Sequence, residues 1–518
     1  MRNRSVVSGF IVLLSLLLSM AAFAAKPEIT YEILDREGYR EVEVKTPLAD
    51  YILSEQGGVM KSSLLTFIPY GSKAAELVPG ATSNLKTLAR QYTADAIFPF
   101  SLSAEGAGEG TYTLDGPSID AETGVFTAAF HGRLAGATVH KTYTIRPDAL
   151  YTVEFSLTVE NPGRAMDLQL TVGNYTAKAK DSDPLEIYYL FDGEPNQLQL
   201  AQGSYTSFDG VGLMNKGVVF FLSLEGRQGV APFLTRMPSG SDHYGVTLSA
   251  GAGTTTLDGT LYGGRRRFLL MQDAGIEKLD SPGVGARMMI PVIQFLELLY
   301  RATGNYGWAI ILFTILLRLV LWPLMQKQMH SMAKMQQLGP KMKQIQERFK
   351  DDKQAQQERL MELYRKEKIN PMSGCLPMIV QLPIIYLIWR AILLAGEQIH
   401  LSPGFLWIPD LSMHDPYFIL VILTTVVMLL QQWLMTPRSG GEGTPGSKYM
   451  GYIFPVVMAV LLWKFPAGLW LYYLLTTAAQ VGQQALVNRQ LQRSSRVTPA
   501  VDAPSGQPGD GDGGTWTN

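Results

Sequence analysis

The sequence has little of what most enzymes and metalloproteins use. Cys375 is the only cysteine among 518 residues, which excludes an internal disulfide and a cysteine-based metal site. The six histidines show no ligand spacing, and we interpret them as structural or solvent-exposed. No Gly-Lys dipeptide occurs, so a Walker A phosphate-binding loop is excluded. The sequence therefore predicts no cofactor, no metal centre and no nucleotide hydrolysis by that route.

Charge is nearly balanced overall but unevenly distributed. The formal net charge is −1, which does not predict nucleic-acid binding. Residues 27–283 are polar and rich in glycine, whereas long apolar runs dominate residues 284–487. This asymmetry predicts a soluble domain followed by a membrane domain.

The N-terminal residues 1–25 combine two positive charges with an apolar run and a small-residue Ala-Phe-Ala-Ala motif. That combination is typical of a cleaved secretory signal peptide. The same segment is also long enough to stay as a signal-anchor helix. In both cases the positive end remains in the cytoplasm and the following residues are exported.

Residues 27–283 predict an all-β domain. Alternating runs such as 152–159 are separated by Gly, Pro, Asn and Asp residues that favour turns. About 250 residues of this pattern indicate a large β-sandwich. Asp192 and Glu194 resemble the carboxylate pairs of glycosidases, but turn chemistry explains them better. We therefore expect a binding or spacer role for this domain.

Helical patterns dominate the remainder of the chain. Residues 284–303 place Gln294, Glu297 and Arg301 on one face and predict an amphipathic helix lying in the membrane interface. A membrane domain at 304–490 follows, and a Pro-, Gly- and Asp-rich tail at 491–518 predicts cytoplasmic disorder. The expected spans are 307–325, 376–395, 417–435, 449–465 and 467–487.

A polar stretch at 326–369 follows the first span. It contains eleven Lys and Arg against six Asp and Glu, an excess that predicts the cytoplasmic side. A break at Asp351 and Asp352 predicts an antiparallel helical hairpin. Its candidate basic contact residues are Lys341, Lys343, Arg348 and Lys350.

Arg318 lies inside the first predicted span. An arginine at the centre of a membrane helix costs ~2.5–3.5 kcal/mol on insertion scales. None of the five spans contains Asp or Glu, so a buried ion pair is excluded and water must reach the guanidinium. We therefore predict a hydrated groove. Its other candidate lining residues are Thr314, Gln381, Thr424, Gln431, Gln432, Tyr472, Tyr473, Thr476 and Gln480. The alternative is that these amides and hydroxyls only join helices, at ~0.6 kcal/mol each.

Several motifs occur in an order that is similar to one known family. They are GNYGWAIILFTILLRLVLWPL, YRKEKINPMSGCLPMIVQLPI, LWIPDLSMHDPY and FPAGLWLYY. In these motifs the chain resembles the YidC family of membrane protein insertases over about residues 284–490. GATVHKTYTI and VEVKTPLADYILSEQGG resemble the exported domain of bacterial members. The resemblance implies a multi-pass bacterial inner-membrane protein with residues 27–283 in the periplasm and the C-terminus in the cytoplasm.

The resemblance also implies a fold and a groove. It implies a β-supersandwich similar to galactose mutarotases, without their activity, followed by five core helices around a groove open to cytoplasm and lipid. Arg318 matches the groove arginine of the family, and Thr314 and Tyr473 match groove positions that meet substrate. Residues 326–369 match a mobile cytoplasmic hairpin. Family members usually keep an uncleaved first helix, from which the Ala-Phe-Ala-Ala motif departs.

We predict a membrane protein insertase and chaperone rather than an enzyme. It would pass nascent inner-membrane proteins through the groove, alone or with the Sec translocon. The expected partners are nascent membrane proteins, the Sec translocon, the ribosome and membrane lipids, without recognition of nucleic-acid sequence. One alternative is a small-anion transporter that uses Arg318, although no internal repeat typical of transporters is visible. A sugar-sensing membrane protein is a third possibility and depends on the β domain alone.

Overall fold

The computed structural model describes most of the chain between residues 28 and 497. The described residues are 28–69, 74–78, 81–84, 89–92, 98–105, 107, 110–161, 163, 165–175, 186–197, 207–225, 229–236, 242–367, 376–435 and 445–497. The predicted signal or anchor segment at 1–25 and tail residues 498–518 lie outside them. Contacts divide the chain into two units, which we describe separately. The first comprises Met1–Phe313, Pro383–Val421 and Leu461–Tyr473, and the second Thr314–Leu382, Ile422–Val460 and Leu474–Asn518.

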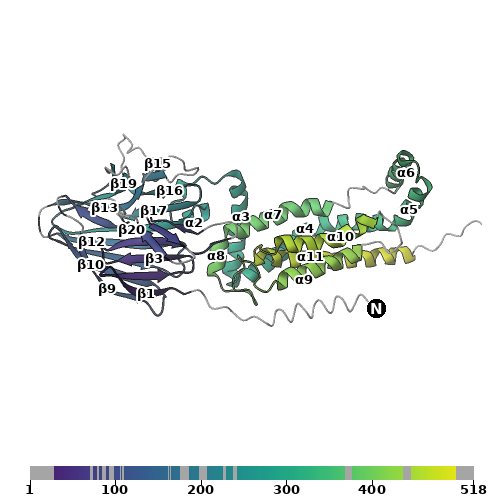
Figure 1. Ribbon diagram of the computed structural model, residues 1–518. Coiled ribbons are helices and arrows are strands. Elements are labelled where there is room, and N and C mark those ends of the chain that lie inside the picture. The colour runs from purple at the N-terminus through teal and green to yellow at the C-terminus, as the bar shows by residue number, and fades with distance from the viewer. Residues whose placement is uncertain are drawn as a thin grey trace, which may run out of the picture. The chain divides into compact units, whose positions relative to one another are not determined.

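The largest element of the first unit is a nine-stranded antiparallel sheet (Figure 1). Its strand order is β15-β14-β16-β17-β20-β12-β11-β10-β9. In that order the strands are Glu194–Gln197, Glu186–Phe191, Phe208–Met214, Val218–Glu225, Gly253–Arg265, Thr152–Asn161, Ala137–Ile145, Phe126–Leu134 and Thr111–Ile119. Burial alternates residue by residue along β11 and β12, as expected when one sheet face packs against a core and the other faces solvent.

Three smaller sheets complete the β domain. A five-stranded sheet contains β1 (Thr30–Arg36), β2 (Tyr39–Lys45), β3 (Ala49–Ser54), β4 (Val59–Leu65) and β5 (Ala75–Glu76), in that order. A four-stranded sheet has the order β18 (Val230–Arg236), β19 (Asp242–Ala250), β13 (Met166–Tyr175) and β8 (Ser101–Ala104). β6 (Ala81–Asn84) pairs with β7 (Ala89–Tyr92).

One hydrophobic core joins these sheets. Leu53 of the five-stranded sheet, Phe130 of the nine-stranded sheet and Leu170 of the four-stranded sheet are all fully buried members of it. Burial of this apolar surface supplies the main driving force for folding, at ~25 cal/mol per Å². The prediction of an all-β domain followed by a helical region is therefore confirmed.

The helices begin after β20. They are α2 (Phe268–Asp273), α3 (Val284–Thr303), α4 (Tyr306–Gln337), α5 (Gly339–Arg348), α6 (Lys353–Lys366), α7 (Leu376–Leu394), α8 (Gly396–Leu401), α9 (Ile419–Met435), α10 (Pro445–Leu462) and α11 (Ala467–Val497), with a 3₁₀ turn η1 at Glu277–Leu279. Among the described residues, Tyr306–Gln326 is long and apolar enough to cross a membrane by itself. Three shorter apolar helices occupy Gln381–Leu394, Ile419–Leu434 and Gly451–Leu462.

The junction between α3 and α4 follows from three residues in sequence. Gly304 ends α3 with a φ of 69°, a left-handed conformation that glycine adopts without a steric penalty. The Asn305 side chain then caps α4, because its Oδ1 accepts a hydrogen bond from the Gly307 backbone N–H at 2.8 Å. Its amide Nδ2 donates to the carbonyl of Gly404 at 2.9 Å and so fixes the start of α4 against the loop after α8.

Two helices extend beyond their predicted ends. α4 continues to Gln337, so the hairpin comprises only α5 and α6 and begins at Gly339 rather than 326. The first residues that disfavour helix after the apolar run are Gly339 and Pro340, which explains the extension. α11 likewise continues to Val497, beyond the predicted end of the last span at 487. The next proline is Pro499, which disfavours helix at the residue before it.

Candidate functional site

The predicted charge in the first span is buried in the second unit. Arg318 is 9% exposed, and its Nη2 donates a hydrogen bond of 3.0 Å to the carbonyl oxygen of Thr476 on α11. Within their described bounds, α4, α7, α9, α10 and α11 contain no Asp or Glu. The carbonyl is a neutral acceptor, so this bond orients the guanidinium without cancelling its charge.

One face of α4 is buried along several turns. Thr314, Arg318, Met325 and Met329 follow one another at spacings of four, seven and four residues, and all are buried. Such spacing places them on one side of an α-helix. Met329 packs against Val487 of α11, about three turns beyond Thr476. α4 and α11 therefore share a contact in which polar residues alternate with apolar ones.

Several polar groups on the buried face of α11 have no hydrogen-bond partner in the contact with α4. Thr476 and Gln483 are seven residues apart and are 1% and 2% exposed. The Thr476 hydroxyl and both amide atoms of Gln483 have no hydrogen-bond partner among the described residues. The amide of buried Gln328 on α4 has none there either. An unsatisfied buried polar group costs about 1–3 kcal/mol, so water is the expected partner at these atoms.

Sequence reasoning missed Gln328 and Gln483. Gln328 lies beyond the predicted end of the first span, in the part of α4 that was assigned to the hairpin. Gln483 follows Thr476 and Gln480 at spacings of seven and three, which is the signal that could have identified it.

A second pair of predicted residues is joined across two helices. The Gln431 amide on α9 donates to the Gln480 amide oxygen on α11 at 3.0 Å. Interhelical amide bonds of this kind contribute ~0.6 kcal/mol on average inside membranes. This contact connects α9 to the same helix that receives Arg318.

A double-mutant cycle of Gln431→Ala and Gln480→Ala measures this contact. We expect a coupling of ~0.6 kcal/mol, and at most ~1.7 kcal/mol, from unfolding midpoints in detergent. A cycle of Gln431→Ala with Ile422→Ala, an exposed residue nine positions earlier on the same helix, is the control and should give no coupling. Coupling above ~1.7 kcal/mol would contradict a simple interhelical bond.

The remaining predicted groove residues fall in both units. Thr424 on α9 is fully buried, and Gln381 on α7 and Gln432 on α9 are half-buried, all in the second unit. The Gln432 side chain lies directly against the backbone of Gly451 on α10, so α9 and α10 are neighbours there. The paired tyrosines belong to the first unit; Tyr472 is buried and Tyr473 half-buried.

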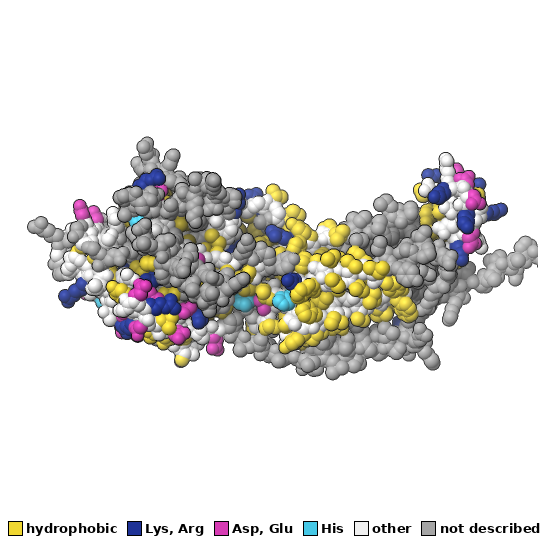
Figure 2. All heavy atoms as spheres, viewed as in Figure 1, with side chains coloured by type: hydrophobic (Ala, Val, Ile, Leu, Met, Phe, Trp, Pro, Cys, Tyr) yellow, Lys and Arg dark blue, Asp and Glu magenta, His cyan; other side chains and the backbone are white. Residues whose placement is uncertain are grey.

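Apolar side chains face outward from the same helices. Figure 2 shows a broad yellow surface over this part of the chain. The exposed apolar residues of these helices in the second unit include Ile315, Leu316, Leu319 and Val320 on α4, Ile422 and Val426 on α9, and Ile453, Val457 and Val460 on α10. An apolar surface of this extent indicates contact with lipid or protein. These helices therefore bury polar side chains and expose apolar ones, which is the reverse of the pattern in soluble helical bundles.

The predicted basic residues of the hairpin lie on its surface. Lys341 of α5 pairs with Glu367 just after α6 at 2.9 Å, and Lys343 pairs with Glu347 within α5 at 3.6 Å. Arg348 and Lys350 are exposed. Asp352 caps α6 by accepting from the backbone N–H of Gln354 and of Ala355. The hairpin thus presents its positive charges to solvent, where ion pairs contribute little.

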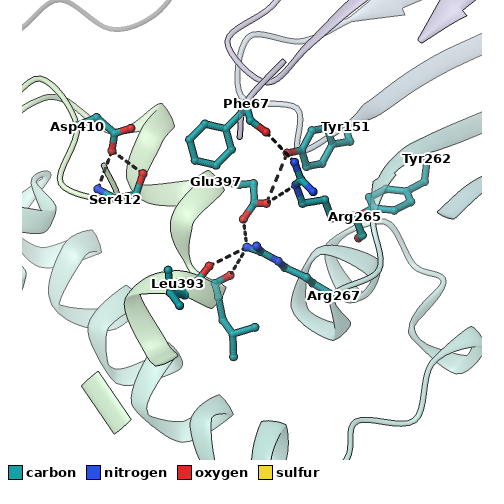
Figure 3. A network of polar contacts seen from close by, with 10 residues as sticks. Phe67, Tyr151, Tyr262, Arg265, Arg267, Leu393, Glu397, Asp410 and Ser412 are labelled. Carbon is teal, nitrogen blue, oxygen red and sulfur yellow. Dashed lines mark hydrogen bonds and ion pairs between the residues drawn. The ribbon is translucent and has the colours of Figure 1, made fainter. Parts of the chain in front are cut away.

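A buried ionic network in the first unit was not predicted (Figure 3). Glu397 on α8 is fully buried and accepts a hydrogen bond from Arg267 at 2.5 Å. The Nε of Arg265 lies 3.9 Å from the other carboxylate oxygen. Arg267 also donates to the Leu393 carbonyl at 2.8 Å. Burial raises the pKa of Glu397, and the charges of Arg267 and Arg265 oppose that shift.

Comparisons with known proteins decide the family. A family model described as 60Kd inner membrane protein matches residues 298–494. Membrane protein insertase YidC of Nitratidesulfovibrio vulgaris is 30% identical over 481 residues, which cover 86% of this chain and 85% of the relative. The insertase of Campylobacter jejuni is 44% identical over 230 residues, covering 44% of this chain and 43% of that protein.

The chain belongs to the YidC family of membrane protein insertases. A crystal structure titled as an active YidC insertase with its first transmembrane domain resolved covers 93% of this chain with a TM-score of 0.53. At 22% identity it supports the fold alone. YidC proteins are inner-membrane proteins named for insertion and not for a catalysed reaction. The predicted family is thus confirmed.

Proposed function

We propose that this YidC-family protein inserts nascent membrane proteins through a hydrated groove that Arg318 and its polar neighbours line. The observation that carries the proposal is the set of buried polar atoms on α4 and α11, the two helices that the Arg318–Thr476 contact joins. Gln328, Gln483 and the Thr476 hydroxyl lack partners among the described residues, and the Arg318 guanidinium donates to a neutral carbonyl. Lipid cannot solvate such groups, whereas a water-filled groove can.

The groove lowers the cost of moving polar segments into the bilayer. A short extracellular segment of a client, especially an acidic one, is attracted to the Arg318 charge. The hydrophobic helix of the client then moves past the apolar outer surfaces into the lipid. This transfer gains ~0.8 kcal/mol for each CH₂ group buried. The membrane potential adds ~2.3 kcal/mol per elementary charge per 100 mV for an acidic segment that crosses outward. No nucleotide is required.

The orientation that fits this function follows the positive charges. The basic hairpin α5–α6 lies in the cytoplasm, the β domain lies in the periplasm, and α11 ends in the cytoplasm. α3 lies in the membrane interface, with exposed Met288 and Leu298 toward lipid. The Sec translocon and the ribosome are the partners expected beside the groove and the hairpin.

Site-specific photo-crosslinking to a stalled nascent membrane protein tests the groove. Crosslinkers at Thr314, Gln432 and Tyr473 should each capture the nascent chain. Val320 is the matched control, because it lies on the same helix as Thr314 and is 74% exposed on the outer surface. Capture from Val320 as strong as that from Thr314 would mean that clients travel along the lipid-facing surface, and it would contradict the groove.

A further inference from the structure

Two histidines meet on the outer face of the nine-stranded sheet. β10 and β11 form a hairpin in which His131 pairs directly with His140. The two Nδ1 atoms lie 2.5 Å apart, and the rings are nearly perpendicular at 81°. Nine residues separate the pair in sequence, so the convergence depends on the strand register and gives no sequence motif.

A carboxylate on the neighbouring strand β9 fixes the tautomer of the His131 ring. Oδ2 of Asp115 on β9 lies 3.2 Å from Nε2 of His131. A carboxylate can only accept a hydrogen bond, so Nε2 carries the proton. In a neutral ring, the lone pair of Nδ1 is then directed toward His140. A carboxylate that holds the distal N–H of an imidazole is the arrangement that supports metal-ligating histidines in proteins.

The spacing suits two bonds to one metal ion. Two Zn–N bonds of about 2.0–2.1 Å at a tetrahedral angle place their nitrogens about 3.3 Å apart. Rotation of the exposed rings of His131 and His140 can supply the difference of about 0.8 Å. No group of three or more His, Cys, Asp or Glu side chains that could hold a metal occurs in the described part of the chain. The pair therefore supplies two ligands, and water completes the coordination.

We propose that His131 and His140 bind one divalent transition-metal ion, such as Zn²⁺ or Cu²⁺, with Asp115 as the positioning residue. Imidazole nitrogens suit these ions, and Cu²⁺ should bind more tightly than Zn²⁺. The side chain of His131 is 44% exposed and that of Asp115 73%, so a hydrated ion reaches the site without a change in the fold. The site is independent of the insertion groove.

Isothermal titration of the full-length protein in detergent, prepared without a polyhistidine tag, tests the site with Zn²⁺ and Cu²⁺. The expected result is one ion per chain. His131→Ala and His140→Ala should each abolish metal binding. Asp115→Asn should weaken metal binding about 10–100-fold, the loss that is typical when a residue hydrogen-bonded to a metal-bound histidine is replaced. Electron paramagnetic resonance of the Cu²⁺ form of the wild type should show coupling to two nitrogens, and neither histidine variant should give that signal.

His414→Ala is the matched control, because this histidine is also exposed but lies far along the chain, where its ring packs near Trp463. It should bind one ion as the wild type does. Circular dichroism of every variant establishes that the β domain is folded. Absence of binding to the wild type, or equal binding by the wild type and the His131→Ala/His140→Ala double variant, would overturn the proposal.

Discussion

Arg318→Ala is expected to reduce insertion of clients with acidic exported segments by about 10–100-fold. The loss corresponds to ~1.5–3 kcal/mol, the range for hydrogen bonds to charged groups, at ~1.4 kcal/mol per factor of ten. The physical reason is the missing positive charge inside a set of helices that contain no carboxylate to replace it. The measurement is protease protection of a radiolabelled client in cells that carry only the variant.

Two comparisons separate charge from packing in that experiment. Arg318→Lys retains the charge and can still reach a carbonyl with one donor, so it should restore most of the insertion. A client whose acidic residues are changed to Asn or Gln should differ by less than about threefold between wild type and Arg318→Ala. Equal loss for the acidic and the neutral client would show that Arg318 acts through stability and not through electrostatic attraction.

The fold class could be predicted from the sequence because hydrophobic periodicity distinguishes strands from helices. The alternating run at 152–159 lies within β12, and long apolar runs became helices. Sheet register was not available from the sequence, since it depends on pairing between strands. Only the register of β10 and β11 brings His131 and His140 together, and the scattered histidines therefore suggested no ligand pair.

Part of the candidate site could also be predicted from the sequence. Arg318 is conspicuous because a charge in an apolar run is expensive wherever its helix lies. One of its contacts is a backbone carbonyl, that of Thr476, and no residue type in the sequence signals such a partner. Gln328 escaped detection because the end of α4 depends on helix-breaking residues rather than on hydrophobicity. The use of these residues as an insertion groove remains our proposal.

Acidic residues in the segment 396–416 show most clearly which contacts cannot be predicted from the sequence. The segment contains no Lys or Arg, and nothing in its sequence indicates that Glu397 and Asp415 are fully buried. Asp415 accepts hydrogen bonds from the Trp407 indole at 3.1 Å and from the Leu420 backbone N–H at 2.7 Å, so it fixes the start of α9. Glu397 meets Arg267, 130 residues earlier in the chain. Long-range ion pairs leave no local signal.

Glu397→Ala is expected to destabilise the contact between α8 and the end of β20 by ~3–5 kcal/mol, because it leaves buried Arg265 and half-buried Arg267 without their carboxylate. Hydrogen–deuterium exchange of backbone amides in 262–273 and 393–401 measures the effect, which should exceed a hundredfold in rate at ~1.4 kcal/mol per factor of ten. Glu154→Ala breaks the exposed pair with Arg146 and is the matched control, with an expected loss of only ~0–1 kcal/mol.

The pH dependence gives a second readout of the same carboxylate. Burial raises the pKa of Glu397 in the folded state, with Arg267 and Arg265 opposing the shift, so the folded state holds this proton more tightly than the unfolded state. The stability that this group contributes is therefore complete below its unfolded pKa and is lost as pH rises through the folded pKa. Glu397→Gln should remove that slope and exchange more slowly than Glu397→Ala, because its amide oxygen still accepts from Arg267. An unchanged slope in Glu397→Gln would assign the titration to another group.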